Sequence, residues 1–393
     1  MSVENLKNNP LNIVIVGAGP AGSLAAYLLA LRGHKVQVLE RKKSIERKVC
    51  GEYLCPKGVD LLEELNLLNH LGAGFSPLHG MVLVSPENEV IPSYFPHVHK
   101  KEKGLSLNRE IFDQRLVDLA IMKGADILFE RIVTSVVFDQ EKRQWAVHTD
   151  KESFECDLLI AADGRQSKIG HLLKHSREAI TDRVALHCYL PRKTHHGLRL
   201  GEMHILENGS YCGLDPIDDD HVNFSIVCNA SLLKNNRPEE IINQTIAGSK
   251  RLQEMFDLVT RKTEIRIVSS LKNSNSFIAG DHLAYLGDAA GFIDPLTGEG
   301  IYNALLSASL LVQSIEKNRG LDLALAEYKR KKKILSLQKN ILNHFFQFLI
   351  RRPLLVGLVV KFLNKSPERA NHFIGIIGNI HTPIQGIIKM LRA

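Results

Sequence analysis

Residues 12–22 read NIVIVGAGPAG, an apolar run that leads directly into a cluster of glycines. The apolar run predicts a buried β-strand, and the Ala- and Leu-rich segment 23–33 predicts a helix that ends at Gly33. The run KVQVLE at 35–40 predicts the next strand. Together these segments predict a βαβ unit, in which the two strands lie parallel.

The glycines between the first strand and the helix have the G-x-G-x-x-G spacing of a dinucleotide-binding turn. Gly17 allows the tight turn, Gly19 lets the backbone approach a pyrophosphate, and Gly22 lets helix and strand pack closely. The helix N-terminus adds N–H donors for the phosphates. Glu40 lies about 20 residues further on, where an acid accepts a ribose hydroxyl. The dinucleotide contacts expected from this unit are Gly17, Gly19, Pro20, Ala21, Gly22, Glu40 and Arg41.

Length and composition indicate a globular protein. The chain has 393 residues, of which 44% are hydrophobic and 24% charged, so it is long enough for two domains and excludes long disorder. Six cysteines and a polar N-terminus predict reduced thiols in a cytoplasmic protein without a secretory leader. No apolar run reaches the roughly 18–20 residues that a membrane-spanning helix needs.

Positive charge is concentrated in the last part of the chain. Residues 329–393 contain 13 Lys or Arg and one acid, Glu368, whereas the remainder is mildly acidic. Stretches such as FFQFLIRRPLLVGLVVKFL (345–363) mix apolar and basic residues, which suits helices on an anionic membrane surface or over a hydrophobic channel. A helical subdomain that caps the body is the alternative. The KRKKK run at 329–333 predicts a solvated helix face, and no nucleic-acid partner or metal site is expected.

Two further glycine-and-acid turns follow predicted strands. AADGRQS (161–167) contains Asp163-Gly164, and YLGDAAGFIDPLTGEGIYNA (285–304) contains Gly287-Asp288. With these three ordered motifs, the sequence resembles the FAD-dependent family that includes aromatic-ring hydroxylases, flavin halogenases and geranylgeranyl reductases. The resemblance covers roughly residues 10–315 and implies a fold like that of para-hydroxybenzoate hydroxylase.

The resemblance implies an α/β fold: a Rossmann-type FAD-binding domain, an inserted antiparallel β-sheet substrate domain and a C-terminal helical region. We expect the FAD-binding domain at 1–73, 101–176 and 281–328, the substrate domain at 74–100 and 177–280, and the basic amphipathic helical region at 329–393.

The same resemblance implies how FAD is held. Asp288 would bind the ribityl or pyrophosphate region, and a helix starting near Gly298 would stabilise negative charge on the reduced flavin. Val133 would offer its backbone to the adenine, while Asp163 is either a direct ligand or a turn-forming acid. The implied FAD contacts are Arg109, Val133, Asp163, Gly164, Gly287, Asp288, Pro295, Gly298, Gly300 and Ile301.

The stretch KVCGEYLCP (48–56) places Cys50 and Cys55 five positions apart, as in flavin disulfide reductases. Those enzymes also need a second G-x-G-x-x-G domain and a His paired with an acid, and GIIGN at 375–379 lacks that pattern. We therefore interpret Cys50 and Gly51 as a loop that passes the flavin and contacts it, with Cys55 as packing. Cys50 is also a weak candidate for a proton donor; no other catalytic residue is identified.

Two sequence motifs of this family help to choose among the reactions that its members catalyse. The single tryptophan, Trp145, excludes the W-x-W-x-I-P stretch of halogenases. YCGLDP (211–216) resembles the Y-x-W-x-F-P stretch of geranylgeranyl reductases, which makes Tyr211 and Pro216 candidate substrate contacts. Gly213 and Asp215, however, stand where that stretch has large apolar groups.

The sequence therefore predicts an FAD-dependent oxidoreductase with NAD(P)H as external electron donor. We expect a monooxygenase that acts on a hydrophobic, polyketide-, quinone- or isoprenoid-like substrate, peripheral to the membrane through 329–393. Two alternatives remain open: reduction of C=C bonds as in geranylgeranyl reductases, and a flavin-binding protein without turnover.

Overall fold

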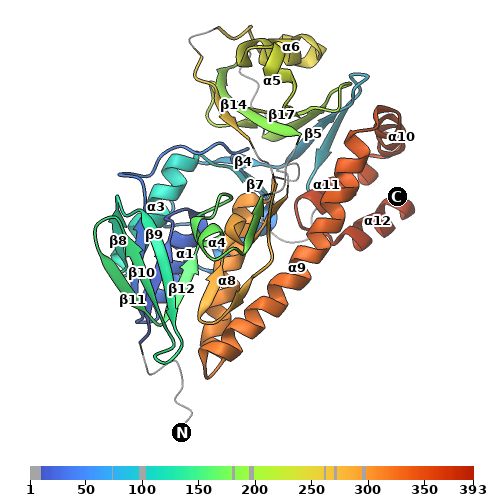
Figure 1. The fold of residues 1–393 in the computed structure, drawn as a ribbon. Helices are drawn as coiled ribbons and strands as arrows, with labels where there is room; N and C mark the ends of the chain where they lie inside the picture. Colours follow the sequence, from blue (N-terminus) through green and yellow to red (C-terminus); the bar gives the residue numbers. More distant parts are fainter. Residues whose placement is uncertain are drawn as a thin grey trace.

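The computed structural model describes residues 10–72, 74–96, 103–178, 182–193, 199–260, 263–269, 272–293 and 298–393. A six-stranded sheet forms the base of the molecule (Figure 1). Its strands, in spatial order, are β20 (Ala279–Gly280), β21 (Leu283–Tyr285), β12 (Leu158–Ala161), β1 (Asn12–Val16), β2 (Lys35–Glu40) and β8 (Asp126–Phe129). All neighbours are parallel except β20 and β21, and the predicted βαβ unit is confirmed by the parallel pairing of β1 with β2.

Each face of this sheet is covered. On one face α1 (Pro20–Ala30), whose residues are all buried, packs against α3 (Arg109–Met122) and α8 (Gly300–Lys317). On the other face lies an antiparallel sheet of β9 (Val133–Asp139), β10 (Gln144–Thr149) and β11 (Ser153–Cys156). Alternate side chains of β1 therefore point into two different cores, which is why NIVIV is apolar throughout.

A second sheet of seven strands stands above the first (Figure 1). Its spatial order is β18 (Arg266–Val268), β14 (Arg183–Pro191), β17 (His221–Asn229), β16 (Tyr211–Pro216), β15 (Leu200–Ile205), β5 (Gly80–Val84) and β6 (Val90–Tyr94). Among these strands only β5 and β15 pair in parallel. One face packs against α6 (Pro238–Ala247) and α7 (Lys250–Met255), next to the short α5 (Leu232–Asn235). The opposite face is free to line a cavity.

Several short strands and helices lie in the segments that connect the larger elements. They are β3 (Tyr53–Leu54), α2 (Pro56–Glu64), β4 (Ser76–Leu78), β7 (Gly104–Ser106), α4 (Lys168–Leu172), β13 (Ser176–Glu178), β19 (Lys272–Asn275), the 3-10 turn η1 (Gly287–Ala290) and β22 (Phe292–Ile293).

Four helices end the chain: α9 (Leu321–Ile350), α10 (Pro353–Leu363), α11 (Pro367–Ile377) and α12 (Pro383–Arg392). The long α9 runs along α8 and β20, and α11 packs against β5 and β6 (Figure 1). The tail therefore packs on the body, but part of its surface stays apolar and exposed, for example at Leu354, Leu358 and Ile384. None of the helices described is both long and apolar enough to cross a bilayer.

Candidate functional site

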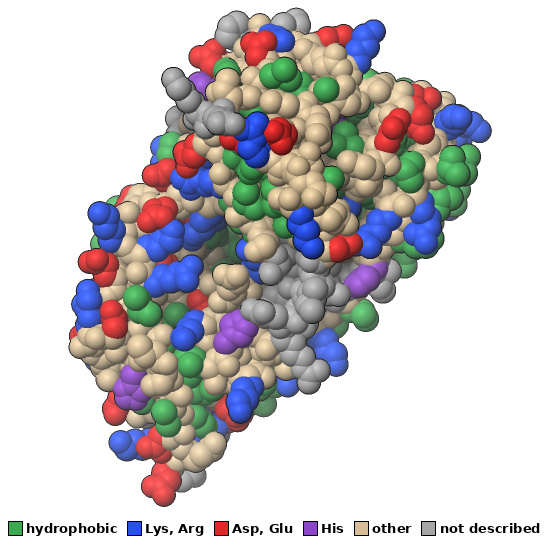
Figure 2. All heavy atoms as spheres, turned by 45° about the horizontal axis from the view of Figure 1, so that its top comes forward, with side chains coloured by type: hydrophobic (Ala, Val, Ile, Leu, Met, Phe, Trp, Pro, Cys, Tyr) green, Lys and Arg blue, Asp and Glu red, His purple; other side chains and the backbone are tan. Residues whose placement is uncertain are grey.

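A cavity of about 800 Å³ lies between the two sheets. The three glycine-and-acid turns border it on one side, and the free face of the seven-stranded sheet borders it on the other. Figure 2 shows a hollow in this part of the surface, with Lys and Arg side chains near its edge. Segments that lie far apart in the sequence thus meet around one space.

The β1–α1 turn needs its glycines because the backbone is crowded there. Gly17 has φ +102°, and a Cβ at this position would lie 2.6 Å from the Ala162 carbonyl oxygen. A Cβ on Gly22 would lie 2.0 Å from the Gly17 carbonyl oxygen, so Gly22 serves helix packing and does not itself line the cavity. This is the tight turn and close helix–strand approach of a phosphate-binding site.

Glu40 is held rigidly at the end of β2. One carboxylate oxygen accepts the Ala18 N–H at 3.0 Å, and the other accepts the Lys42 N–H at 3.1 Å. A carboxylate has about four lone-pair sites, so these two bonds leave room for a hydroxyl donor from the cavity. Glu40 and Arg41 both line the cavity.

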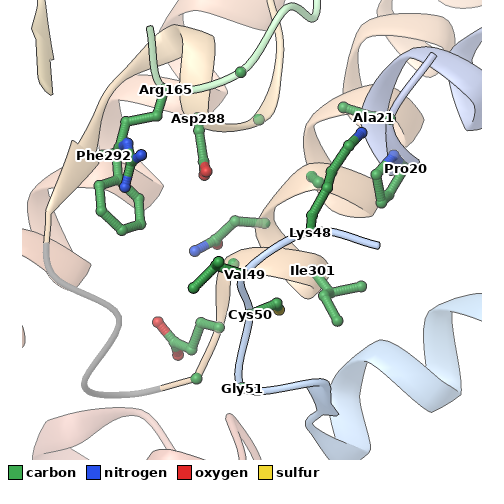
Figure 3. Close-up of a pocket in the computed structure, with 18 of the residues that line it drawn as sticks. Pro20, Ala21, Lys48, Val49, Cys50, Gly51, Arg165, Asp288, Phe292 and Ile301 are labelled. Carbon is green, nitrogen blue, oxygen red and sulfur yellow. The ribbon is translucent and has the colours of Figure 1, made fainter. Parts of the chain in front are cut away.

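Asp288 and Asp163, which are both half-buried, supply carboxyl groups at the opposite wall of the cavity. Figure 3 shows Asp288 pointing into the cavity, with Arg165 and Phe292 on one side and Pro20 and Ala21 across the space. Burial raises the pKa of Asp288, an effect that Arg165 partly offsets. Asp163 accepts the Ile169 N–H at 3.0 Å, and burial raises its pKa too. Its second oxygen, Oδ1, has no partner among the described residues.

Arg109 is a buried partner of Asp113. Its Nε and Nη2 donate to the two carboxylate oxygens of Asp113, at 2.9 and 2.8 Å, so the pair is bidentate. Burial alone would lower the pKa of Arg109, but the Asp113 carboxylate outweighs it and the pKa is raised. Arg109 is therefore a fixed cation at the cavity, and Lys48 lies nearby, with its Nζ 3.8 Å from Asp113.

The loop of Cys50, Gly51 and Glu52 crosses the middle of the cavity and is tied to the second sheet (Figure 3). Asn223 Nδ2 donates to the Cys50 carbonyl at 2.9 Å, and the Tyr189 hydroxyl donates to Glu52. Burial raises the pKa of the Cys50 thiol, so it is protonated at neutral pH. Cys55 is buried, and all six cysteines are free, so no disulfide faces the cavity.

The free face of the seven-stranded sheet changes from polar to apolar along its strands. Near the Cys50 loop it presents Tyr189, Asn223 and Asp215, which follow one another across β14, β17 and β16. At the far end Tyr211 and Val227 join an apolar cluster with residues of α9. A molecule in this space would therefore meet polar groups at one end and hydrophobic ones at the other.

Helix α9 lines one side of the cavity, and its Phe346 and Ile350 belong to the apolar cluster of Tyr211 and Val227. Its lining residues are Lys332, Leu335, Ser336 and Asn343. Lys332 belongs to the KRKKK run for which a solvated face was expected; it is half-buried and lines the cavity, whereas Lys329, Arg330 and Lys333 are exposed. The spacing of basic residues along a helix does not by itself show which face of the helix will pack against the rest of the protein.

Most of the residues expected from the sequence come together at the cavity. They are Gly17, Gly19, Pro20, Ala21, Glu40, Arg41, Cys50, Gly51, Arg109, Asp163, Gly164, Tyr211, Gly287, Asp288, Gly298, Gly300 and Ile301. Val133 lies instead in the core between the two sheets of the base, and neither Gly22 nor Pro216 lines the cavity. Pro295 lies outside the described residues.

Other lining residues were not expected from the sequence. Among them are Arg47, Lys48, Arg165, Phe292 and Asp215. Arg165 follows the Asp163-Gly164 motif directly, which is a signal that could have been used. Asp215 belongs to the YCGLDP stretch, which pointed to its strand but not to its side chain. Arg47 has no such signal, because only the packing of the second sheet brings it to the cavity.

Comparison with known proteins identifies relatives of the chain. The family described as FAD binding domain matches residues 11–320. Menaquinone reductase of Mycolicibacterium smegmatis is 28% identical over 78% of this chain and 76% of its own length. Digeranylgeranylglycerophospholipid reductase 2 of Methanosphaera stadtmanae is 29% identical over 75% of each chain. Conditioned medium factor receptor 1 of Dictyostelium discoideum is 25% identical over 78% of this chain but only 64% of its own length.

Solved structures share the fold. A flavoprotein/dehydrogenase from Cytophaga hutchinsonii superposes with a TM-score of 0.80, at 20% identity and over 98% of both chains. PqsL of Pseudomonas aeruginosa, described as a probable FAD-dependent monooxygenase, superposes with a TM-score of 0.73 at 20% identity over 90% of this chain and 100% of its own. At these identities the likeness establishes the Rossmann-type flavoprotein fold.

Proposed function

The chain belongs to the FAD binding domain family and is an FAD-dependent oxidoreductase; from this premise we propose that it reduces a carbon–carbon double bond in a hydrophobic, isoprenoid- or quinone-type substrate. One observation carries the proposal. A single cavity joins the glycine turn to a sheet face that becomes apolar toward α9. Two relatives of 28–29% identity, named as reductases of a quinone and of an isoprenoid lipid, support it.

The residues around the cavity fit FAD. Added Cβ atoms would meet nothing within 4 Å at Gly51, Gly164 and Gly300, so the backbone at these positions faces open space. In our proposal the β1–α1 turn holds the pyrophosphate, Glu40 the ribose, Asp288 the ribityl region and the start of α8 the isoalloxazine. FAD, when bound, supplies hydride transfer between an external donor and the substrate.

The chain's own groups have three roles in this proposal. The Cys50 loop separates the flavin region from the substrate region, because it lines the cavity and is bonded to β14 and β17. The protonated Cys50 thiol is the candidate that delivers a proton to the reduced carbon. Tyr211, Val227 and α9 exclude water around the substrate chain.

A single-turnover experiment tests the reaction. Enzyme reduced with NADH or NADPH under anaerobic conditions is mixed with a prenylated naphthoquinone or with a geranylgeranyl lipid. We expect the flavin to reoxidise and the isoprenoid chain of the product to gain two hydrogens, which stay in the chain after air has reoxidised any quinol to the quinone. Flavin that stays reduced with both substrates would contradict the proposal. In the first step of the experiment, loss of the absorbance of oxidised flavin with NADH or with NADPH shows which of the two is the electron donor.

Monooxygenation is the second candidate. Gly213 and Asp215 replace the large apolar groups of the reductase-type stretch, and this leaves polar room beside the sheet. The same reduced enzyme, mixed with substrate and ¹⁸O₂, would then yield a product that contains one labelled oxygen atom. Product labelled in this way, without anaerobic turnover, would replace the reductase proposal.

We also propose that the tail rests on an anionic membrane. Leu354 is 85% and Leu358 64% exposed on one face of α10, close in sequence to Arg351 and Arg352. Figure 2 shows hydrophobic side chains beside Lys and Arg on this side of the molecule. Such a surface combines apolar burial with attraction to anionic lipid.

Sedimentation with anionic vesicles tests the membrane contact. The double variant Leu354→Asp, Leu358→Asp should bind vesicles of phosphatidylglycerol more weakly than the unmodified protein. Leu258→Asp is the matched control, since Leu258 is similarly exposed but lies outside the tail. Equal binding of all three proteins would exclude a role for this face.

A further inference from the structure

Asp215 is a buried residue of the cavity wall, and one of its carboxyl oxygens lacks a hydrogen-bond partner among the described residues. It lies on β16 in the middle of the seven-stranded sheet and is 7% exposed. Its Oδ1 has no hydrogen-bond partner among the described residues. On the neighbouring strand, a Cβ at Gly201 would lie 2.7 Å from this oxygen, so the sheet has room for the carboxyl only because Gly201 has no side chain.

The neighbours of Asp215 are already engaged. Asn223, directly opposite on β17, donates to the Cys50 carbonyl and accepts from Ser225. Tyr189, next in the same row, donates to Glu52. Asp215 is therefore the member of this polar row with a carboxyl oxygen, Oδ1, that has no hydrogen-bond partner among the described residues.

A second polar group faces the same space without a partner. The Tyr53 hydroxyl is buried, has no partner among the described residues, and belongs to the cavity lining. It interacts electrostatically with Asp215. Two uncompensated polar groups in one part of a cavity indicate a place where a ligand supplies the missing polar atom.

The charges around Asp215 favour its neutral form. Burial and the nearby Glu52 carboxylate raise the pKa of Asp215 to about 8, burial being the larger cause. No described Lys, Arg or His forms an ion pair with it. The titratable or charged groups on the surrounding elements include Arg47, Glu52, Tyr53, His187, Tyr189, Glu202 and Glu299. Glu202 lies on the neighbouring strand β15 and forms an ion pair with Arg251. Below pH 8 the carboxyl therefore carries a proton and acts as a donor.

We propose that Asp215 donates a hydrogen bond to a neutral oxygen of the substrate, a carbonyl or a hydroxyl, at the end of the molecule that reaches the Cys50 loop. The apolar remainder of the substrate then lies along Tyr211 and Val227 toward α9. The inference rests on the proposed function for the hydrophobic substrate. It adds that the substrate is oxygenated where it meets the polar row, so that a plain hydrocarbon is a poor ligand.

Equilibrium binding to the oxidised, FAD-loaded enzyme tests this assignment. The probes are a prenylated naphthoquinone, geranylgeraniol and an oxygen-free C20 isoprenoid, and the readout is the change in flavin absorption on binding. We expect the quinone to bind about tenfold more weakly at pH 9.5 than at pH 6.5, because ionised Asp215 no longer donates to its carbonyl oxygen. The alcohol can instead donate its own hydroxyl hydrogen to the ionised carboxylate, so its affinity should change little with pH and should depend on Asp215 only in the variants below.

Two variants separate hydrogen bonding from packing. Asp215→Asn keeps a donor and should bind the quinone with an affinity that no longer changes with pH. Asp215→Leu restores an apolar group and should lose about tenfold for the quinone and for the alcohol while it binds the oxygen-free C20 isoprenoid at least as well. The exposed Asp219→Asn is the control and should behave as the unmodified protein.

The outcomes are distinguishable. If the unmodified protein binds the oxygenated probes with no dependence on pH and Asp215→Leu binds them equally well, the assignment of Asp215 is overturned while the proposed function stands. If the unmodified protein binds the oxygen-free isoprenoid and neither oxygenated probe, the assignment is also wrong. If it binds none of the three, the proposed function fails together with this inference.

Discussion

The Tyr189 hydroxyl donates to both carboxylate oxygens of Glu52, at 2.7 and 2.8 Å. Tyr189 belongs to β14 of the seven-stranded sheet, and Glu52 belongs to the loop that crosses the cavity. Glu52 is fully buried and has a positive φ of 58°, an uncommon conformation for a residue with a side chain. This contact therefore couples the position of the Cys50 loop to the sheet that faces it.

Tyr189→Phe should loosen this coupling. The variant leaves a buried carboxylate without its side-chain donor, which costs about 1–3 kcal/mol in the free energy of unfolding. Denaturation in urea measures the loss, and the flavin absorption of the loaded protein should shift because the loop moves. Tyr94→Phe is the control, because Tyr94 is 52% exposed. An unchanged spectrum and stability in Tyr189→Phe would show that the contact does not position the loop.

Gly17→Ala should abolish retention of FAD. The residue has φ +102°, and the added Cβ would lie 2.6 Å from the Ala162 carbonyl oxygen, so the turn must open. Gly33→Ala is a matched control, since Gly33 also has a positive φ but has no atom within 4 Å of an added Cβ. The measurement is the ratio of flavin to protein absorbance after purification. A Gly17→Ala protein that keeps its flavin would contradict the role of the turn.

Asp113→Ala should destabilise the fold by about 3–5 kcal/mol, because it leaves the Arg109 guanidinium buried and unpaired. Asp257→Ala removes an exposed partner of Lys193 instead and should change the free energy of unfolding by less than about 1 kcal/mol. Urea denaturation of both variants provides the comparison. Similar small losses would mean that Arg109 finds water or another acceptor.

The Cys50 thiol should give no thiolate–flavin charge-transfer band during titration with dithionite. Burial raises its pKa, so the thiolate is scarce at pH 7–8. Absorption spectra of the unmodified protein and of Cys50→Ala should therefore match at long wavelength, with Cys156→Ala as a control outside the cavity. A band that disappears only in Cys50→Ala would show a thiolate beside the flavin.

The stability of the protein should depend on pH through Asp215. Its folded pKa of about 8 lies above the value of about 3.9 expected in the unfolded chain. The unfolded state releases this proton first, so the stabilisation is complete below about pH 4 and is lost as the pH rises through 8. Melting temperatures between pH 5 and 9 should fall more steeply for the unmodified protein than for Asp215→Asn. Parallel curves would place the folded pKa of Asp215 near its unfolded value.

Much of the cofactor half of the site was predictable from the sequence. The first glycine motif, the Asp163-Gly164 turn and the Asp288 turn all line the cavity, because each depends on a strand end and a few neighbouring residues. Arg109 was expected beside the cofactor, but its buried partner Asp113 was not. The i,i+4 spacing of these two residues was a usable local signal.

The substrate half was much less predictable. The contact of Tyr189 with Glu52 joins residues that are 137 positions apart, and no sequence pattern around either residue predicts it. YCGLDP identified the strand of Asp215 but not that its carboxyl is buried without a partner, which depends on Gly201, Tyr53 and Glu52. Burial and pairing of this kind arise only when distant strands are packed together.

The sequence by itself determined the βαβ unit, the order of the three turns and membership of a flavoprotein family, because backbone conformation at a glycine turn depends on residues within a few positions. Only the tertiary structure decided which side chains face the cavity beyond those turns. It placed Lys332 of the basic run in the lining of the cavity, and it brought Asp215 and the Cys50 loop to the same cavity. The reason is that the solvent exposure and the pKa of a buried group depend on residues that are distant in the sequence and become its neighbours only in the folded protein.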